Sequence, residues 1–194
     1  TVPEQTFLGA MLEEDPVVGS LRRRMKATAE EDKVLVDFDS VVSRDVADTV
    51  HRLVTRLQTD WLVMEWGLDA HKGYVQNHPL GWLVDHLPCN LALVKDMGIR
   101  KVREILVLAQ PGPHDSLVVT TADHLSQIYR AKVTFARFVK EGTPPIEVQS
   151  ESAYLDQLAG LFERPHSNLI LFGKDEVKTV VKATAGYDLL IMGA

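Results

Sequence analysis

From about Val17 onward, short apolar runs alternate with amphipathic helical patterns, and this alternation is what most restricts the fold. Uninterrupted apolar runs are typical of strands in parallel sheets, which helices cover on both faces. Strands that alternate with helices form right-handed crossovers, so the pattern predicts an α/β protein with an open parallel sheet. The expected strands are residues 33–38, 60–64, 90–94, 104–108, 133–136, 168–172 and 188–192. The expected helices include residues 17–29, 46–57, 79–87, 118–129, 155–162 and 177–181.

One pattern occurs twice in the chain. Asp-Trp-Leu-Val-Met begins at Asp60 and Asp-Leu-Leu-Ile-Met begins at Asp188, and each follows a strand pattern and an amphipathic helix. Such a repeat indicates two copies of one unit. We therefore predict a first unit over residues 1–97, which lacks its opening strand–helix–strand, and a second over residues 98–194, which stops directly after a Met-Gly pair. Asp60 and Asp188 are expected at the same place in the two units.

The charge and the single cysteine narrow the classes of function. The chain has 27 acidic and 21 basic residues, a net charge of -6. A negative surface repels phosphate groups, which argues against general nucleic-acid binding and against a basic membrane-surface patch. No run approaches the roughly 18 apolar residues of a membrane span, so we expect no direct membrane insertion by this segment. Cys89 has no second cysteine to pair with, which fits a reducing, cytoplasmic compartment.

Three parts of the sequence resemble universal stress proteins. Residues 81–94, Gly-Trp-Leu-Val-Asp-His-Leu-Pro-Cys-Asn-Leu-Ala-Leu-Val, are similar to that family's closing helix and fifth strand. Residues 105–114 are similar to its first strand and following loop, and the patterns at Asp60 and Asp188 to its fourth strand. The resemblance implies the open parallel sheet of the universal stress proteins, also described as adenine nucleotide alpha hydrolase-like, in two incomplete tandem units.

Two short motifs resemble one branch of this family. They are the Gly-Pro-His turn that begins at Gly112 and the sequence Glu65-Trp66-Gly67 after the first repeated strand. In that branch, tandem units are fused to the cytoplasmic C-terminus of amino-acid permeases and related transporters. The resemblance thus implies a transmembrane transporter domain in the same polypeptide.

The first unit departs from the pattern of nucleotide-binding members. In those members, glycines after the fourth strand let backbone N–H groups approach the phosphates. Here Glu65 and Leu68 stand at two of the glycine positions, and the pair Gly81-Trp82 lacks the usual hydroxyl. A carboxylate directed at a triphosphate opposes binding, so we predict that the first unit does not bind ATP.

The second unit keeps part of the nucleotide motif. The Met-Gly pair is present, but Gln110 replaces the Asp that contacts the base in nucleotide-binding members. The resemblance implies that any ATP or AMP site here would include Ala109, Gln110, Gly112, Met192 and Gly193. No other cofactor is expected.

Two other constellations do not predict chemistry. Three histidines, His71, His78 and His86, lack the paired spacing of metal ligands, so we expect no metal site. The sequence His114-Asp115-Ser116 contains the residue types of a catalytic triad, but a triad brings its groups together from separate elements. We therefore expect no catalytic residues.

The preferred interpretation is a non-catalytic regulatory and dimerisation module in the cytoplasm, at the C-terminus of a membrane transporter. One alternative is a free-standing universal stress protein that binds ATP or AMP, which an intact glycine loop after Gly193 would favour. A second is an α/β nucleotide hydrolase, which would require a base and metal ligands near that loop.

The apolar strand of residues 90–94 predicts how the module associates. An uncovered apolar strand edge promotes aggregation because its N–H and C=O groups are unpaired. We expect this strand to pair with the same strand of a second chain in a twofold homodimer, with Leu91 and Leu93 at the interface. Its corresponding strand in the second unit, or a further C-terminal segment, is the alternative cover.

Overall fold

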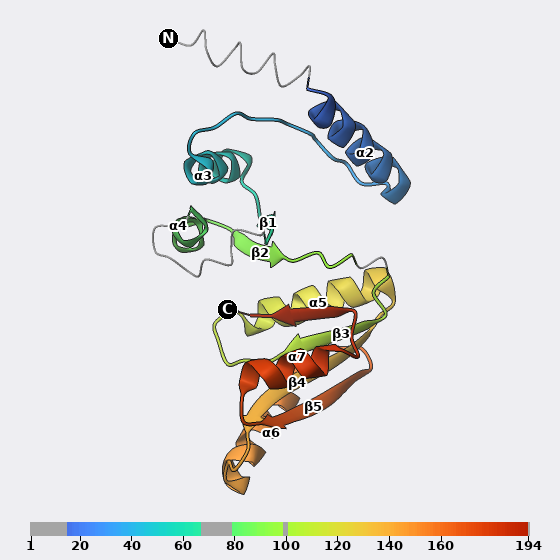
Figure 1. The fold of residues 1–194 in the computed structure, drawn as a ribbon. Coiled ribbons are helices and arrows are strands. Elements are labelled where there is room, and N and C mark those ends of the chain that lie inside the picture. The colour runs from blue at the N-terminus through green and yellow to red at the C-terminus, as the bar shows by residue number, and fades with distance from the viewer. Residues whose placement is uncertain (1–14, 67–78, 99–100, 194) are drawn as a thin grey trace. The chain divides into compact units, whose positions relative to one another are not determined.

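The computed structural model describes residues 15–66, 79–98 and 101–193 of the chain (Figure 1). The chain splits into two compact units, Thr1–Asp96 (unit 1) and Met97–Ala194 (unit 2). The division lies one residue from the boundary that the repeat indicates. Within the described ranges, no helix is long and apolar enough to cross a membrane.

Unit 2 contains a parallel sheet of four strands in the order β5-β4-β3-β6. Strands and helices alternate along it: β3 (Glu104–Leu108), α5 (Asp115–Tyr129), β4 (Lys132–Lys140), α6 (Pro145–Ala159), β5 (His166–Gly173), α7 (Glu176–Thr184) and β6 (Leu189–Met192). The chain steps outward from β3 to β4 and β5, then returns through α7 to place β6 on the other side of β3 (Figure 1). This reversal beside β3 is a topological switch point, where open α/β sheets bind ligands at the carboxyl ends of their strands.

The central strand β3 is buried on both of its faces. Residues 105–108 are at most 3% exposed. Ile105 and Val107 pack into an apolar cluster with α5 and α6, whereas Leu106 and Leu108 pack into a second cluster that includes α7. Burying one such side chain stabilises a protein by about 1.5–3 kcal/mol. The uninterrupted apolar run therefore places helices on both faces of the sheet, as expected.

Asp188 ties the start of β6 to the start of β3. Its carboxylate accepts hydrogen bonds from the backbone N–H groups of Arg103 (2.7 Å) and Glu104 (3.1 Å). The N–H of Asp188 donates in turn to the carbonyl oxygen of Glu104, at 2.9 Å. The two N–H groups, Arg103 first, hold the pKa of the Asp188 carboxyl below its usual value, because they stabilise the ionised form.

Unit 1 contains a smaller sheet of two strands. Its described elements are α2 (Pro16–Asp32), α3 (Val46–Leu57), β1 (Trp61–Glu65), α4 (Pro79–His86) and β2 (Asn90–Val94). The two strands are parallel, and their register places Trp61 opposite Asn90. The helices α3 and α4 pack together, with Val54 and Leu83 buried. Asp60 directly precedes β1, as Asp188 directly precedes β6.

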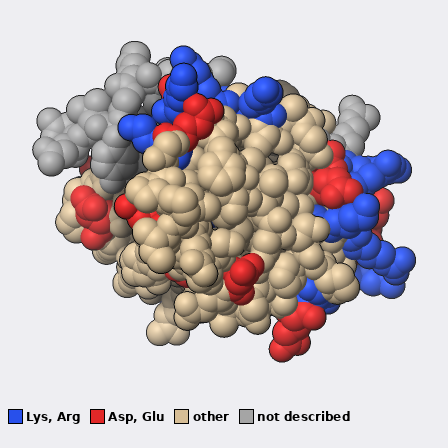
Figure 2. Space-filling model, turned by 90° about the horizontal axis from the view of Figure 1, so that it is seen from below, with Lys and Arg blue, Asp and Glu red and all other residues tan. Residues whose placement is uncertain are grey.

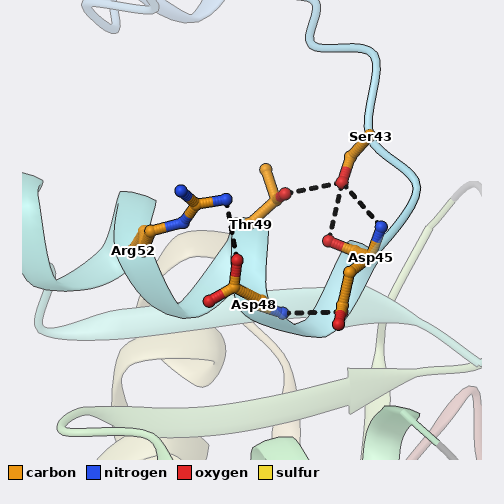
Figure 3. A network of polar contacts seen from close by, with 5 residues as sticks. All are labelled: Ser43, Asp45, Asp48, Thr49 and Arg52. Atoms are coloured by element: carbon orange, nitrogen blue, oxygen red, sulfur yellow. Dashed lines mark hydrogen bonds and ion pairs between the residues drawn. The ribbon is translucent and has the colours of Figure 1, made fainter.

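Polar contacts define the start of α3 (Figure 3). Asp45 is the N-cap residue, and its carboxylate accepts a hydrogen bond from the N–H of Asp48 at 3.0 Å. The Ser43 hydroxyl donates to the carbonyl oxygen of Asp45 and lies 2.6 Å from the Thr49 hydroxyl. Arg52 forms an ion pair with Asp48 at 2.7 Å. An N-cap of this type stabilises a helix by about 1 kcal/mol.

The strand expected over residues 33–38 is not formed, so this prediction was wrong. The segment has no regular structure, and Leu35 is fully exposed. Its β-branched residues favour a strand, but a strand also needs a neighbour for its N–H and C=O groups. In unit 2 the strand at the same point in the element order is β5, which pairs with β4. The described part of unit 1 has no counterpart of β4, so residues 33–38 have no strand to pair with.

The helix α2 is exposed for the same reason, because the described part of unit 1 has no counterpart of β4 for it to pack against. The order α2, residues 33–38, α3 and β1 repeats the order α6, β5, α7 and β6. In unit 2, α6 packs against β4 and β5 and buries Leu155 and Leu158. No residue of α2 is buried.

We predict that Asp188→Asn lowers the melting temperature, because it removes the charge that accepts two backbone hydrogen bonds. The pKa of Asp188 is lowered on folding, so its stabilisation is fully present above the unfolded value of about 3.9 and is lost as the pH falls through the folded value. Calorimetric melts of both proteins from neutral pH downward should therefore converge below about pH 4.

The matched control is Asp60→Asn, because no described residue donates a hydrogen bond to the Asp60 side chain. It should leave the melting temperature unchanged. A difference between wild type and Asp188→Asn that persisted unchanged into acid would contradict the proposed role of the charge.

Candidate functional site

The structure brings the residues expected at a nucleotide site to one edge of the unit 2 sheet. Leu108 at the end of β3 lies opposite Met192 at the end of β6. Ala109 and Gln110 therefore emerge beside Gly193, at the carboxyl ends of adjacent parallel strands and at the switch point. Their role in binding remains a prediction.

Part of the backbone at this edge is already hydrogen-bonded. Ala109 is buried, its N–H donates to the carbonyl oxygen of Ala136 at 2.8 Å, and its own carbonyl oxygen accepts from the Arg137 guanidinium at 3.2 Å. A Cβ at Gly193 would lie 3.2 Å from a methyl group of Val118 on α5. The glycine thus allows the end of β6 to approach α5 closely.

The loop after β3 is held by a carboxylate. Asp115 accepts a hydrogen bond from the N–H of Gly112 at 3.1 Å through one oxygen and from the Tyr154 hydroxyl at 2.9 Å through the other. Burial first, and then the hydrogen bond to Asp115, raise the pKa of Tyr154 to about 12. Tyr154 is therefore neutral at physiological pH, and it links α6 to the start of α5.

Arg137 is the central side chain of this edge, and the sequence analysis did not identify it. Only 16% of its side chain is exposed, and it forms an ion pair with Glu151 on α6 at 2.6 Å. The guanidinium also lies 5.7 Å from the centre of the Tyr154 ring. The sequence feature that could have identified it is the position of Arg137 within the largely apolar run of β4. A charged residue is buried at such a position only when it is paired.

Gln110 also has a partner within the chain. Its side-chain amide donates to the Glu176 carboxylate at the start of α7, at 2.8 Å. In this arrangement the amide that would read a base is engaged by an acidic residue. The described edge thus carries the carboxylates of Asp115, Glu151 and Glu176, each in a hydrogen bond with a neighbouring group.

These charges disfavour a polyphosphate ligand. Each carboxylate repels phosphate, and the guanidinium of Arg137 is already neutralised by Glu151 at hydrogen-bond distance. Figure 2 shows one face of the molecule, with acidic and basic side chains mainly around a largely uncharged centre and without a broad basic surface. This face therefore offers no continuous electrostatic track for a nucleic-acid backbone.

Some of the residues considered for metal binding or a triad have other partners in the described structure. Among the described residues, no group of three or more His, Cys, Asp or Glu side chains could hold a metal ion. His86 stacks on Trp82 with ring centres 4.5 Å apart, whereas His71 and His78 lie outside the described residues. Asp115, part of the triad-like sequence, is bonded to the Gly112 loop and Tyr154.

The remaining expected positions lie in unit 1. Leu91 and Leu93 are on β2, and Leu93 is 37% exposed. Glu65 ends β1, and Trp82 lies on α4. Gly67 and Leu68 fall outside the described residues.

We predict that Arg137→Met lowers the free energy of unfolding by about 1–3 kcal/mol, because it leaves Glu151 and the Ala109 carbonyl oxygen without their donor. Urea denaturation measures the loss. Lys132→Met is the matched control on the same strand: its ammonium pairs with Glu104 at 3.2 Å but is 83% exposed, so the change should cost about 0–1 kcal/mol. Equal losses in the two variants would contradict a special role for Arg137.

No protein-family model matches the chain, and no curated protein matches it. Solved structures similar to it are universal stress proteins and a mycobacterial protein. A universal stress protein in complex with cAMP has a TM-score of 0.38 and 14% identity, and the match covers 47% of this chain and 76% of that one. Protein Rv1636 from Mycobacterium tuberculosis H37Rv has a TM-score of 0.37 and 14% identity, covering 50% and 74%. Universal stress protein UspA from Lactobacillus plantarum has a TM-score of 0.34 and 18% identity, covering 49% and 79%.

These matches cover about half of this chain, and their identities and TM-scores support no conclusion about its function. The parallel register and open edges of both sheets define an α/β protein. The class expected from the sequence, α/β with open parallel sheets, is confirmed, and the resemblance to universal stress proteins remains a prediction.

Proposed function

We propose that this chain is a non-catalytic regulatory and dimerisation module of the universal stress protein type. The observation that carries the proposal is the internal bonding of the unit 2 edge. Arg137 is held by Glu151 and by the carbonyl oxygen of Ala109, and Gln110 is held by Glu176. An incoming nucleotide would have to break these bonds and would meet carboxylates where its phosphates need cations.

Catalysis is disfavoured by the same arrangement. Phosphoryl transfer and nucleotide hydrolysis depend on cations placed to neutralise the developing phosphate charge. The buried cation of the described edge, Arg137, is already paired, and Asp115, Glu151 and Glu176 are each engaged in hydrogen bonds. We therefore rank the nucleotide hydrolase below both non-enzymatic alternatives.

The association with a transporter is the finer part of the proposal. It derives from the resemblance of the Gly-Pro-His turn at Gly112 and of Glu65-Trp66-Gly67 to the permease-fused branch. In this proposal the module lies at the cytoplasmic face of the membrane, as part of a larger protein. The reading frame upstream of Thr1 tests it: hydrophobic spans of about 20 residues there would support it, and their absence would favour the free-standing protein.

We predict that isothermal titration calorimetry with ATP and magnesium detects no saturable site in either unit. In unit 1 the reason is Glu65 and Leu68 at the glycine positions. In unit 2 it is the internal pairing of Gln110 and Arg137. Repeating the titration with AMP, which has two phosphates fewer than ATP, distinguishes the two causes. Binding of AMP but not ATP would indicate charge repulsion, whereas binding of neither would indicate a blocked base site.

A matched pair of glycine variants shows where any binding occurs. A Cβ at Gly112 has no neighbour closer than 3.8 Å, so Gly112→Ala is tolerated by the protein and would obstruct only a bound ligand. Gly186→Ala, with nothing within 4 Å of its Cβ, is the control. ATP binding that Gly112→Ala weakens and Gly186→Ala does not would establish the nucleotide-binding alternative instead.

Dimerisation through β2 is the second element of the proposal. In the described part of unit 1, β2 is hydrogen-bonded only to β1, so its other edge is open. Leu93 and Val94 are 37% and 46% exposed, and the first charge after them is Lys95. A second copy that pairs edge to edge would satisfy the backbone groups and cover these side chains.

Static light scattering should give an oligomeric mass for the wild type and a lower mass for Leu91→Lys and Leu93→Lys, because each substitution places a desolvated ammonium at the strand interface. Val63→Lys is the control, since Val63 is a 63% exposed residue of the neighbouring strand β1. A monomeric wild type, or a dimer that neither leucine substitution alters, would exclude β2 as the interface.

A further inference from the structure

The outer edge of β5 is an open strand edge in unit 2. β5 is the end strand of the sheet order and pairs with β4 from His166 to Gly173. No described residue forms a backbone hydrogen bond with its outer side. Leu169 and Phe172 are 37% and 55% exposed. With 8 residues, β5 is twice as long as β6, the strand with 4 residues at the other end of this sheet.

This strand lacks the features with which proteins usually protect an edge. Edge strands are commonly short, or they carry lysine, proline or a bulge that prevents pairing with another chain. The sequence of β5, His-Ser-Asn-Leu-Ile-Leu-Phe-Gly, contains no lysine, arginine, acidic residue or proline. Its register with β4 runs without interruption, so it contains no bulge.

The charge pattern around β5 favours a second copy of the same chain as its occupant. Copies of a chain with a net charge of -6 repel one another, so they associate where the contact is neutral. Glu163 and Arg164 precede the uncharged strand, and Lys174 and Asp175 follow it. If two copies of β5 pair antiparallel, the start of one strand lies beside the end of the other. Glu163 and Arg164 of one copy then lie near Lys174 and Asp175 of the second copy, at both ends of the contact. Arg164 also pairs with Asp123 of its own chain at 3.0 Å.

We propose that β5 pairs antiparallel with β5 of a second copy across a twofold axis. The contact joins two four-stranded sheets into one continuous sheet and satisfies the open backbone groups of both edges. It is a surface of unit 2 and is independent of the β2 contact of unit 1. A chain with both contacts forms assemblies larger than a dimer.

The test is the molar mass of Phe172→Lys by size-exclusion chromatography with light scattering. Phe172 is half exposed, so the change should leave the fold intact while placing a charge on the edge strand. In the Leu93→Lys background, which removes the β2 contact, the added substitution should halve the mass, from twice the 21.7 kDa chain to 21.7 kDa. If β2 is not an interface, Phe172→Lys alone should produce the same halving, so the two proposals fail separately.

The matched control is Val181→Lys on α7, since Val181 is 64% exposed and lies outside β5. The proposal is overturned if Phe172→Lys leaves the mass unchanged in both backgrounds, if Val181→Lys halves it equally, or if the wild type is monomeric. Hydrogen exchange provides a second readout. Amides of residues 166–173 should exchange more slowly as the wild-type concentration rises, and this dependence should disappear in Phe172→Lys.

Discussion

The pairing of β3 on both sides governs the rest of unit 2. This strand bonds to β4 along one edge and to β6 along the other, and both of its faces are covered. The helices α5 and α6 pack on the Ile105 side and α7 on the Leu106 side. Because the chain reverses direction beside β3, the carboxyl ends of β3 and β6 lie next to each other at one edge of the sheet. The candidate site is a consequence of that reversal, since Ala109 and Gly193, which are 84 positions apart, emerge side by side.

The described part of unit 1 has the same order of elements without a counterpart of the central strands β3 and β4. Its α2, residues 33–38, α3 and β1 follow the order of α6, β5, α7 and β6, yet α2 buries nothing and residues 33–38 remain outside any sheet. In unit 2, Asp188 anchors its strand through the N–H groups that open β3, whereas Asp60 has no such donors among the described residues. Helices and strands in this fold are therefore stabilised mainly by the sheet they contact, and local propensity alone does not organise them.

Much of the fold could be predicted from the sequence, because short apolar runs have a strong and local signal. Residues 90–94 and 104–108 form strands with the expected bounds, and α3 has the bounds that its apolar stripe indicates. The error at residues 33–38 has a specific physical origin: strand formation depends on a partner, and local sequence does not state whether the partner exists. The expectation that Asp60 and Asp188 each open a strand agrees with their positions, while the superposition of the two units remains a prediction.

The candidate site was only partly predictable, because the sequence did not indicate the hydrogen bonds that Arg137 makes there. Parallel pairing alone places Ala109 and Gln110 beside Gly193. It does not indicate that Arg137 from β4 reaches back to the Ala109 carbonyl oxygen while Glu151 from α6 holds it, since that requires the angle at which α6 crosses the sheet. A binding edge needs donors and acceptors that are free until the ligand arrives, because breaking internal bonds subtracts from affinity. Here the guanidinium, the glutamine amide and the carboxylates already satisfy one another. These side-chain bonds link β3, β4, α5, α6 and α7 at one edge of the sheet, so a ligand that binds there has to replace them.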